Sequence, residues 1–89
     1  MVKRGRLEIM YDILDLVKNS HNGIKPTPLL RKSNLSSSRF KEYYAEILEK
    51  GFIDEIKNSD EKRIRISNRG LLFLEKYKII IGFVEEFGL

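Results

Sequence analysis

Residues 35–51, with the sequence LSSSRFKEYYAEILEKG, place the strongest constraint on how this chain can fold. Ser36, Ser37 and Ser38 stand near the start of the segment, and serine hydroxyls accept hydrogen bonds from the unpaired amides of a helix's first turn. Gly51 stands at the end, where glycine readily adopts the left-handed conformation that closes many helices. We therefore predict a helix here, with a serine N-cap and a glycine stop.

The apolar residues of this predicted helix recur every three or four positions, a spacing that places them on one buried face. They are Phe40, Tyr44, Ile47 and Leu48. Because a helix turns by about 100° per residue, Ser38, Glu42 and Ala45 point away from that face. Arg39 and Lys41 lie on its two flanks, so the exposed side is polar with a cation at each edge.

A β-hairpin is predicted directly after this helix. Residues 52–57 and 62–67 both combine isoleucine with charged residues, and the polar residues 58–61 between them form a turn. In the second strand the alternation has a period of two, so Arg63 and Arg65 both face outward. The residues expected to face inward are Phe52, Ile53, Ile56, Ile64 and Ile66.

Two further helices are predicted before residue 35. The first covers residues 6–19 and carries an apolar stripe that we expect in the core: Leu7, Met10, Ile13, Leu14 and Val17. The second covers residues 28–33, with Thr27 as its cap and Pro28 in its first position. A short strand at residues 24–25 is expected to pair with the edge of the hairpin. The short turn before residue 35 makes the second and third helices a helix-turn-helix candidate.

The last predicted helix runs from residue 68 to residue 87, is capped by Ser67, and would be about 30 Å long. Its apolar residues are too many for one face, and five of them follow heptad spacing: Phe73, Tyr77, Ile80, Val84 and Phe87. The second half of the helix has no core left to enter, so we predict a homodimer through paired C-terminal helices, parallel or antiparallel. The alternative is a bend at Gly82 that folds the helix back within one chain.

The net charge is +4, and the cations are unevenly distributed. Lys3, Arg4 and Arg6 cluster at the N-terminus. Residues 25–41 contain five cations and no acid, and they coincide with the predicted helix-turn-helix. A surface that binds the phosphates of a nucleic acid needs cations gathered in this way.

Several function classes lack the residues they require. The absence of cysteine excludes disulfides and thiolate metal sites, and favours a reducing, cytoplasmic location. His21 is the only histidine and has no metal-ligating or acidic partner near it in sequence. Without a nucleophile–base set or a glycine-rich phosphate loop, we expect no enzyme, no metal, no cofactor and no small-molecule ligand.

We also expect no association with a membrane. The most apolar stretch lies near the C-terminus and is interrupted by Glu75, Lys76 and Lys78, so it cannot form a membrane span. The N-terminus is basic but lacks the apolar run of a signal peptide.

The order of helix, short strand, helix, helix, hairpin and long helix is similar to that of winged helix-turn-helix proteins, which have a mainly α (α+β) fold with a small β-hairpin. The segments LEIMYDIL, LEKGFI and RISNRGLLFL resemble the small archaeal winged-helix proteins that dimerise through an antiparallel C-terminal coiled coil. This resemblance covers nearly the whole chain. It implies a single domain, with a winged helix-turn-helix unit over residues 1–70 and a C-terminal dimerisation helix over residues 68–89.

The activity implied by the resemblance is binding of double-stranded DNA, as a transcription regulator or as a nucleoid-associated chromatin protein. The N-terminal half of the helix at residues 35–51 would then enter the major groove, where we expect Ser37, Ser38, Arg39 and Lys41. Arg39 can form a bidentate pair with guanine. The cations expected at backbone phosphates are Arg4, Arg6, Lys25, Arg31, Lys32, Arg63 and Arg65.

A second function class is a winged-helix module that binds proteins and not DNA, because a fold alone does not fix a function. Acids on the outward face of the helix and at the tip of the hairpin fit this class, since they would repel phosphate. They are Glu42, Glu46, Asp60 and Glu61. A steep salt dependence of binding to duplex DNA distinguishes the first class from the second.

Overall fold

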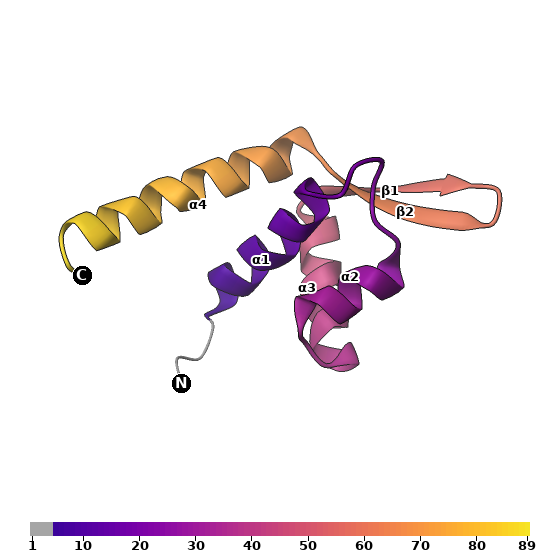
Figure 1. Ribbon diagram of the computed structural model, residues 1–89, viewed down its shortest axis with the longest axis horizontal. Coiled ribbons are helices and arrows are strands. Elements are labelled where there is room, and N and C mark those ends of the chain that lie inside the picture. Colours follow the sequence, from indigo (N-terminus) through magenta and orange to yellow (C-terminus); the bar gives the residue numbers. More distant parts are fainter. Residues whose placement is uncertain (1–4) are drawn as a thin grey trace.

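Residues 5–89 are described in the computed structural model of this chain, and they form four helices and one hairpin (Figure 1). In chain order the elements are α1 (Arg6–Lys18), α2 (Pro26–Ser33), α3 (Ser37–Glu49), β1 (Ile53–Asn58), β2 (Glu61–Ile66) and α4 (Asn68–Glu86). This order confirms the predicted mainly α fold with a small antiparallel hairpin and a long last helix. Lys3 and Arg4, two of the N-terminal cations, lie outside the described residues.

The core is built around α1, which contacts α2, α3, α4 and β2. Its buried residues are Ile9, Met10, Ile13, Leu14 and Val17. The other elements contribute Leu29 of α2, Phe40 and Ile47 of α3, Ile53 and Ile64 of the hairpin, and Leu74 of α4. Every element therefore meets in one apolar core, with α1 at its centre.

Two residues predicted to be buried are exposed. Leu7 is 47% exposed, although it shares a side of α1 with the fully buried Leu14, because it stands in the first turn of the helix, beyond the limit of the core. Ile9 is buried instead. Leu48 is 37% exposed because it stands about 100° around α3 from the fully buried Ile47, at the edge of the buried face. The helical spacing gave the correct face for most positions, but not its limits.

The second helix begins at Pro26, two residues before the predicted start, so Thr27 is not its N-cap. Lys25 occupies that position with an extended backbone and makes no side-chain cap bond. Proline suits the first helical position because its N–H is not needed there and its φ is already helical. Asn34 ends α2 in the left-handed conformation, with φ of 62°, and turns the chain into α3.

The hairpin pairs in a single register from Ile53 opposite Ile66 to Asn58 opposite Glu61. Ile24 forms a bridge to Ile64, with N–O distances of 2.9 and 2.8 Å, which confirms the predicted pairing of this segment with the hairpin edge. Ile56 pairs with Arg63 and therefore shares the outward face, where it is half-exposed. Its predicted inward position is wrong, because the register places it one step off the buried face.

The last helix extends away from the other elements and gives the described chain extents of 50 × 28 × 21 Å (Figure 1). Ser67 is its N-cap, as predicted, and accepts a hydrogen bond of 3.0 Å from the amide of Gly70. The helix continues unbroken through Gly82. The alternative in which its second half folds back onto the same chain is therefore not observed.

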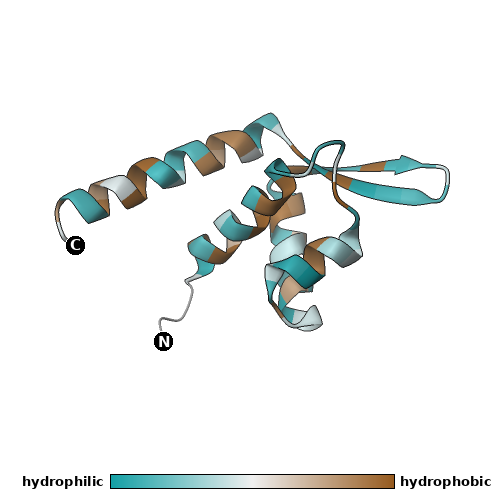
Figure 2. Ribbon diagram, in the orientation of Figure 1, coloured by the Kyte–Doolittle hydropathy of each residue, from teal (hydrophilic) through white to brown (hydrophobic). Residues whose placement is uncertain are grey.

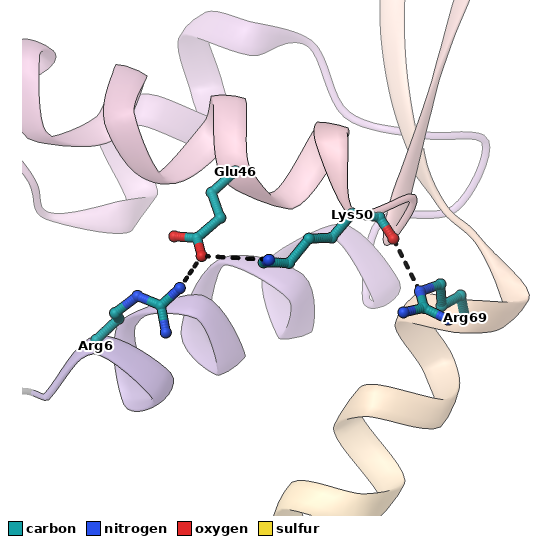
Figure 3. Close-up of polar contacts among 4 residues, drawn as sticks. All are labelled: Arg6, Glu46, Lys50 and Arg69. Carbon is teal, nitrogen blue, oxygen red and sulfur yellow. Dashed lines mark hydrogen bonds and ion pairs between the residues drawn. The ribbon is translucent and has the colours of Figure 1, made fainter.

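The start of α4 is fixed against the end of α3 by a set of hydrogen bonds across the base of the hairpin. The Ser67 hydroxyl donates to the carbonyl oxygen of Gly51 at 2.6 Å, and the Ser67 amide donates to that of Phe52 at 3.1 Å. Arg69 Nε donates to the Lys50 carbonyl at 2.9 Å (Figure 3). Gly70 lies so close to this turn that an added Cβ would stand 2.2 Å from the Phe52 carbonyl oxygen. We call these six residues the α3–α4 junction.

The close approach at Gly70 predicts a large cost for any side chain there. We expect Gly70→Ala to lower the free energy of unfolding by about 1–3 kcal/mol, the range for overpacked sites, because the backbone at the α3–α4 junction must move. Gly82→Ala is the matched control, since an added Cβ there meets nothing within 4 Å. It should raise stability by about 0.5–1 kcal/mol through helix propensity. Urea denaturation followed by circular dichroism measures both, and equal effects would contradict this account.

Candidate nucleic-acid interface

The third helix begins with the predicted serine cap. Ser36 is the N-cap, and its hydroxyl accepts a hydrogen bond of 3.3 Å from the amide of Arg39. Ser37 and Ser38 follow in the first turn and are exposed, as are Arg39 and Lys41. The predicted residues of the N-terminal half of this helix therefore share an accessible surface, and its end carries the partial positive charge of the helix dipole.

Four of the predicted cations are free of acids. Arg31 and Lys32 are exposed in the last turn of α2, and Arg39 and Lys41 are exposed in the first half of α3. Within residues 5–89, no carboxylate lies within ion-pair distance of these four side chains. The helix-turn-helix therefore presents four cations that make no ion pair within the described part of the protein.

Three other predicted cations form ion pairs within the chain. Arg6 of α1 pairs with Glu46 of α3, which also lies 3.9 Å from Lys50 (Figure 3). Lys25 lies 2.9 Å from Glu61, and Arg63 lies 3.5 Å from the same carboxylate. These contacts connect neighbouring elements, so Arg6, Lys25 and Arg63 are less available to an external anion than the four cations above. Arg65 is exposed without such a pair in the described chain, while Arg4 falls outside it.

A groove of about 390 Å³ runs between α2, the start of α3 and the hairpin. Its lining residues are Pro26, Thr27, Leu30, Ser37, Phe40, Lys41, Tyr44 and Lys62. The charged members of this set, Lys41 and Lys62, are both cations, and Ser37 adds a hydroxyl. We call this the lysine groove. Its composition suits an anionic group such as a phosphate.

Lys62 was not among the candidate residues from sequence, although it lies in the lysine groove. The register of the hairpin explains why Lys62 lies in this groove. Lys62, Ile64 and Ile66 alternate with Arg63 and Arg65, so Lys62 shares the face of the hairpin that turns toward the core. Arg63 and Arg65 lie on the opposite face. The period of two was visible in the sequence, but the closeness of α3 to the far end of that face was not.

Tyr44, Glu55 and Lys62 form a polar cluster beside the lysine groove. Lys62 Nζ lies 2.8 Å from the Glu55 carboxylate, which also accepts a hydrogen bond from the Tyr44 hydroxyl. Lys62 Nζ stands 5.8 Å from the centroid of the Tyr44 ring. The bond from Lys62 is the main cause of a pKa of Glu55 below its usual value, and the bond from Tyr44 adds to it. Burial is the main cause of the raised pKa of Tyr44, with Glu55 reinforcing it.

Four of the five candidate dimer residues divide into two groups, and the fifth, Val84, is half-buried. Phe73 and Tyr77 pack within their own chain, where their ring centroids lie 5.1 Å from that of Phe52 and 5.0 Å from that of Tyr11, respectively. Ile80 and Phe87 are 53% and 61% exposed. They belong to a set of exposed apolar side chains along one side of α4, which we call the apolar stripe: Leu72, Ile79, Ile80, Phe83 and Phe87. Figure 2 shows hydrophobic positions recurring along α4 into its projecting half.

Other kinds of site have little support in the described chain. Within residues 5–89, no group of three or more histidine, cysteine or acidic residues is placed to hold a metal ion. No helix in that range combines the length and the apolar character that crossing a membrane requires.

Comparison with known proteins gives a family and several structural relatives. A family model described as winged helix-turn-helix matches residues 3–84. Sso10a-2, a DNA-binding protein from Sulfolobus solfataricus, is 23% identical with a TM-score of 0.76, over 94% of this chain and 85% of that one. F-93 of SSV1 is 22% identical with a TM-score of 0.66, over 98% and 97% of the two chains. The PcaV transcriptional regulator from Streptomyces coelicolor is 15% identical with a TM-score of 0.74, over 89% of this chain and 60% of that one.

At these identities the structural relatives show a shared fold. No curated protein matches the sequence.

The ion pairs of the hairpin predict a loss of stability in acid. Lys62 lowers the pKa of Glu55, and Lys25 lowers the pKa of Glu61, relative to the ordinary value of 4.5. A carboxylate whose pKa is lower in the folded state stabilises the fold above its unfolded pKa, and this contribution is lost as pH falls through the folded pKa. We expect the free energy of unfolding to fall between pH 5 and pH 3, and Glu55→Gln to reduce that fall. Urea titrations at both pH values measure it, and an unchanged pH dependence in the variant would contradict the assignment.

Proposed function

Because the chain belongs to the winged helix-turn-helix family, we propose that it binds double-stranded DNA as a homodimer, as a transcription regulator or a chromatin-associated protein. The observation that carries this proposal is the group of cations around the α2–α3 turn that make no ion pair within residues 5–89: Arg31, Lys32, Arg39 and Lys41. Cations without internal partners bind DNA phosphates without first having to break an ion pair. The printed descriptions of Sso10a-2 as a DNA-binding protein and of PcaV as a transcriptional regulator agree with it.

In the proposed complex the N-terminal half of α3 enters the major groove. Ser37, Ser38 and Arg39 face the base edges, and Arg39 pairs with guanine through two hydrogen bonds. Its guanidinium lies 6.0 Å from the Tyr43 ring centroid, and this contact holds the side chain near the helix surface. Arg31, Lys32, Lys41 and Arg65 bind backbone phosphates, which gives affinity and register without reading sequence.

Arg6, Lys25 and Arg63 were also predicted to bind phosphate, and we now propose a different main role for them. Each is engaged by Glu46 or Glu61 in the free protein. Arg6 joins α1 to α3, and Lys25 joins the start of α2 to the hairpin. These pairs stabilise the arrangement of the elements and neutralise acids that would otherwise repel the backbone.

The homodimer is proposed from the apolar stripe of α4. Ile79, Phe83 and Phe87 are each more than half exposed, on a part of the helix that extends away from the core (Figure 1). A row of exposed apolar side chains marks a surface that binds a partner. A second copy of α4 covers this stripe in the proposed dimer, so the interface retains Ile80 and Phe87 from the predicted seam and adds Ile79 and Phe83.

The second candidate, a protein-binding module, is favoured by Glu42 and Glu49, which are exposed on α3, and by Asp60 at the tip of the hairpin. Glu46 and Glu61 support it less than expected, because both are neutralised within the chain.

For the first candidate, DNA binding, we propose that the protein acts in the cytoplasm, on the nucleoid, and performs no catalysis.

Binding to DNA predicts a specific loss of salt dependence. We expect Lys41→Gln to weaken binding to a labelled mixed-sequence duplex about 3–10-fold and to reduce the slope of log K against log salt by about 0.9, the value for one phosphate contact. Lys78→Gln on α4 is the matched control, since it removes the same charge far from the helix-turn-helix. Fluorescence anisotropy at several salt concentrations measures both. Equal losses in the two variants would point to net charge alone and would count against this interface.

The dimer predicts that a charge on the apolar stripe separates the subunits. We expect Phe83→Asp to yield a folded monomer, because Phe83 is 55% exposed and outside the core. Gly82→Asp introduces the same charge one residue away, about 100° around the helix, and should leave a dimer. Sedimentation velocity gives the mass, and circular dichroism checks the fold. A wild-type protein that sediments as a monomer would refute the dimer.

A further inference from the structure

We propose that Glu55 acts as an internal competitor for DNA: its carboxylate holds Lys62 in the free protein, and a backbone phosphate entering the lysine groove displaces it. The inference rests on the proposed function and adds a regulatory residue to the same site. Nothing in the sequence pattern marked either Glu55 or Lys62 for such a role.

The competing contact is defined by the hairpin register. Glu55 lies opposite Ile64 and Lys62 lies opposite Lys57, so Glu55 and Lys62 are diagonal neighbours on one face. Their side chains meet at 2.8 Å. Asp54 lies opposite Arg65 on the other face, so it cannot reach Lys62 in this way.

The groove beside this contact is suited to the competing phosphate. Lys41 of α3 and Lys62 of β2 line it from two sides, and Ser37 contributes a hydroxyl. No acid is among the lining residues of the groove. A phosphate placed between the two lysines would gain two charge-assisted contacts, whereas Glu55 offers Lys62 only one.

The existing ion pair is weak enough to be exchanged. Both side chains are partly exposed, at 37% for Lys62 and 29% for Glu55, and ion pairs near the surface contribute little because water screens them. When Lys62 leaves, the Tyr44 hydroxyl remains as a donor to the Glu55 carboxylate. Tyr44 therefore keeps the released acid hydrogen-bonded and allows Lys62 to change partner while the hairpin stays in place.

The consequence is a reduced affinity for any duplex, whatever its sequence. Each binding event must break the Glu55–Lys62 pair and leave a negative charge close to the phosphate backbone. Removing the charge of Glu55 should therefore strengthen binding, while the number of phosphate contacts stays the same because Lys62 contacts the backbone in both complexes.

The test compares Glu55→Gln with Asp54→Asn in the anisotropy titration of the mixed-sequence duplex. Glutamine keeps a carbonyl that can accept the Tyr44 hydroxyl, so the hairpin should remain in position. Both variants raise the net charge by one unit, but only Glu55→Gln frees Lys62. We expect Glu55→Gln to strengthen binding about 3–10-fold with little change in the salt slope, while Asp54→Asn has a clearly smaller effect on affinity.

A double-mutant cycle with Lys62→Gln separates competition from a structural role. In the wild-type background Lys62→Gln should cost little affinity, because the phosphate contact that Lys62 makes is offset by the ion pair with Glu55 that must be broken to make it. In the Glu55→Gln background the same change should remove the whole gain. Equal costs of Lys62→Gln in the two backgrounds, or a Glu55→Gln variant that is folded and binds no better than Asp54→Asn, would overturn the inference while leaving DNA binding intact. A wild-type protein that binds no duplex at low salt would overturn both proposals.

Discussion

The contact between Gly70 and the Phe52 carbonyl is the constraint on which the arrangement of the other elements depends. The α3–α4 junction unites the end of α3, the base of the hairpin and the start of α4 within a few residues. Gly51 turns the chain there with a φ of 76°, and Ser67 closes the hairpin by bonding to both Gly51 and Phe52. The direction of the hairpin relative to α3, and the direction in which α4 leaves the domain, are therefore set at the same place.

This arrangement gives the two ends of the molecule different properties. At one end the first halves of α2 and α3 and the hairpin enclose the lysine groove, with free cations nearby. At the other, α4 extends beyond the core and exposes the apolar stripe. A single binding unit has a limited area to offer DNA, and pairing two copies through α4 would present two such surfaces in a fixed relation. The proposed dimer therefore supports the proposed binding instead of being independent of it.

Charge counting alone would have overestimated the DNA-binding surface. Arg6, Lys25 and Arg63 look equivalent to Arg39 and Lys41 in the sequence, but the fold gives them acidic partners on neighbouring elements. The same pairing neutralises Glu46 and Glu61, two of the acids that argued against DNA. The cations available to bind DNA are thus fewer and more localised than the composition suggests. Those between elements are paired with acids, and those around the α2–α3 turn are not.

The sequence predicted those parts of the structure that depend on neighbouring residues in the chain. The serine caps of α3 and α4 and the glycine at residue 51 act within a few positions, and all are observed. The pairing of Ile24 with the hairpin was also correct. Errors arose where distant elements decide the outcome: Leu7 and Leu48 lie beyond the limits of the core, and Ile56 depends on strand register.

The functional site was less accessible to sequence analysis for the same reason. Lys62 stands 21 residues after Lys41, and only the fold brings both to one groove. Tyr44 and Glu55 bond to each other across α3 and the hairpin. From the sequence, Tyr44 was predicted only as part of the buried helix face and Glu55 only as part of the first strand. Phe73 and Tyr77 fitted a heptad, but their own domain supplies ring partners for both.

The most direct test of the central claim is to map the amide resonances that change when a short duplex is added to the labelled protein. If the helix-turn-helix binds DNA, the largest shifts will fall on Arg31, Lys32 and residues 37–41, with a further set around Lys62, while the projecting half of α4 changes little. Shifts confined to α4, or no shifts at low salt, would contradict the account.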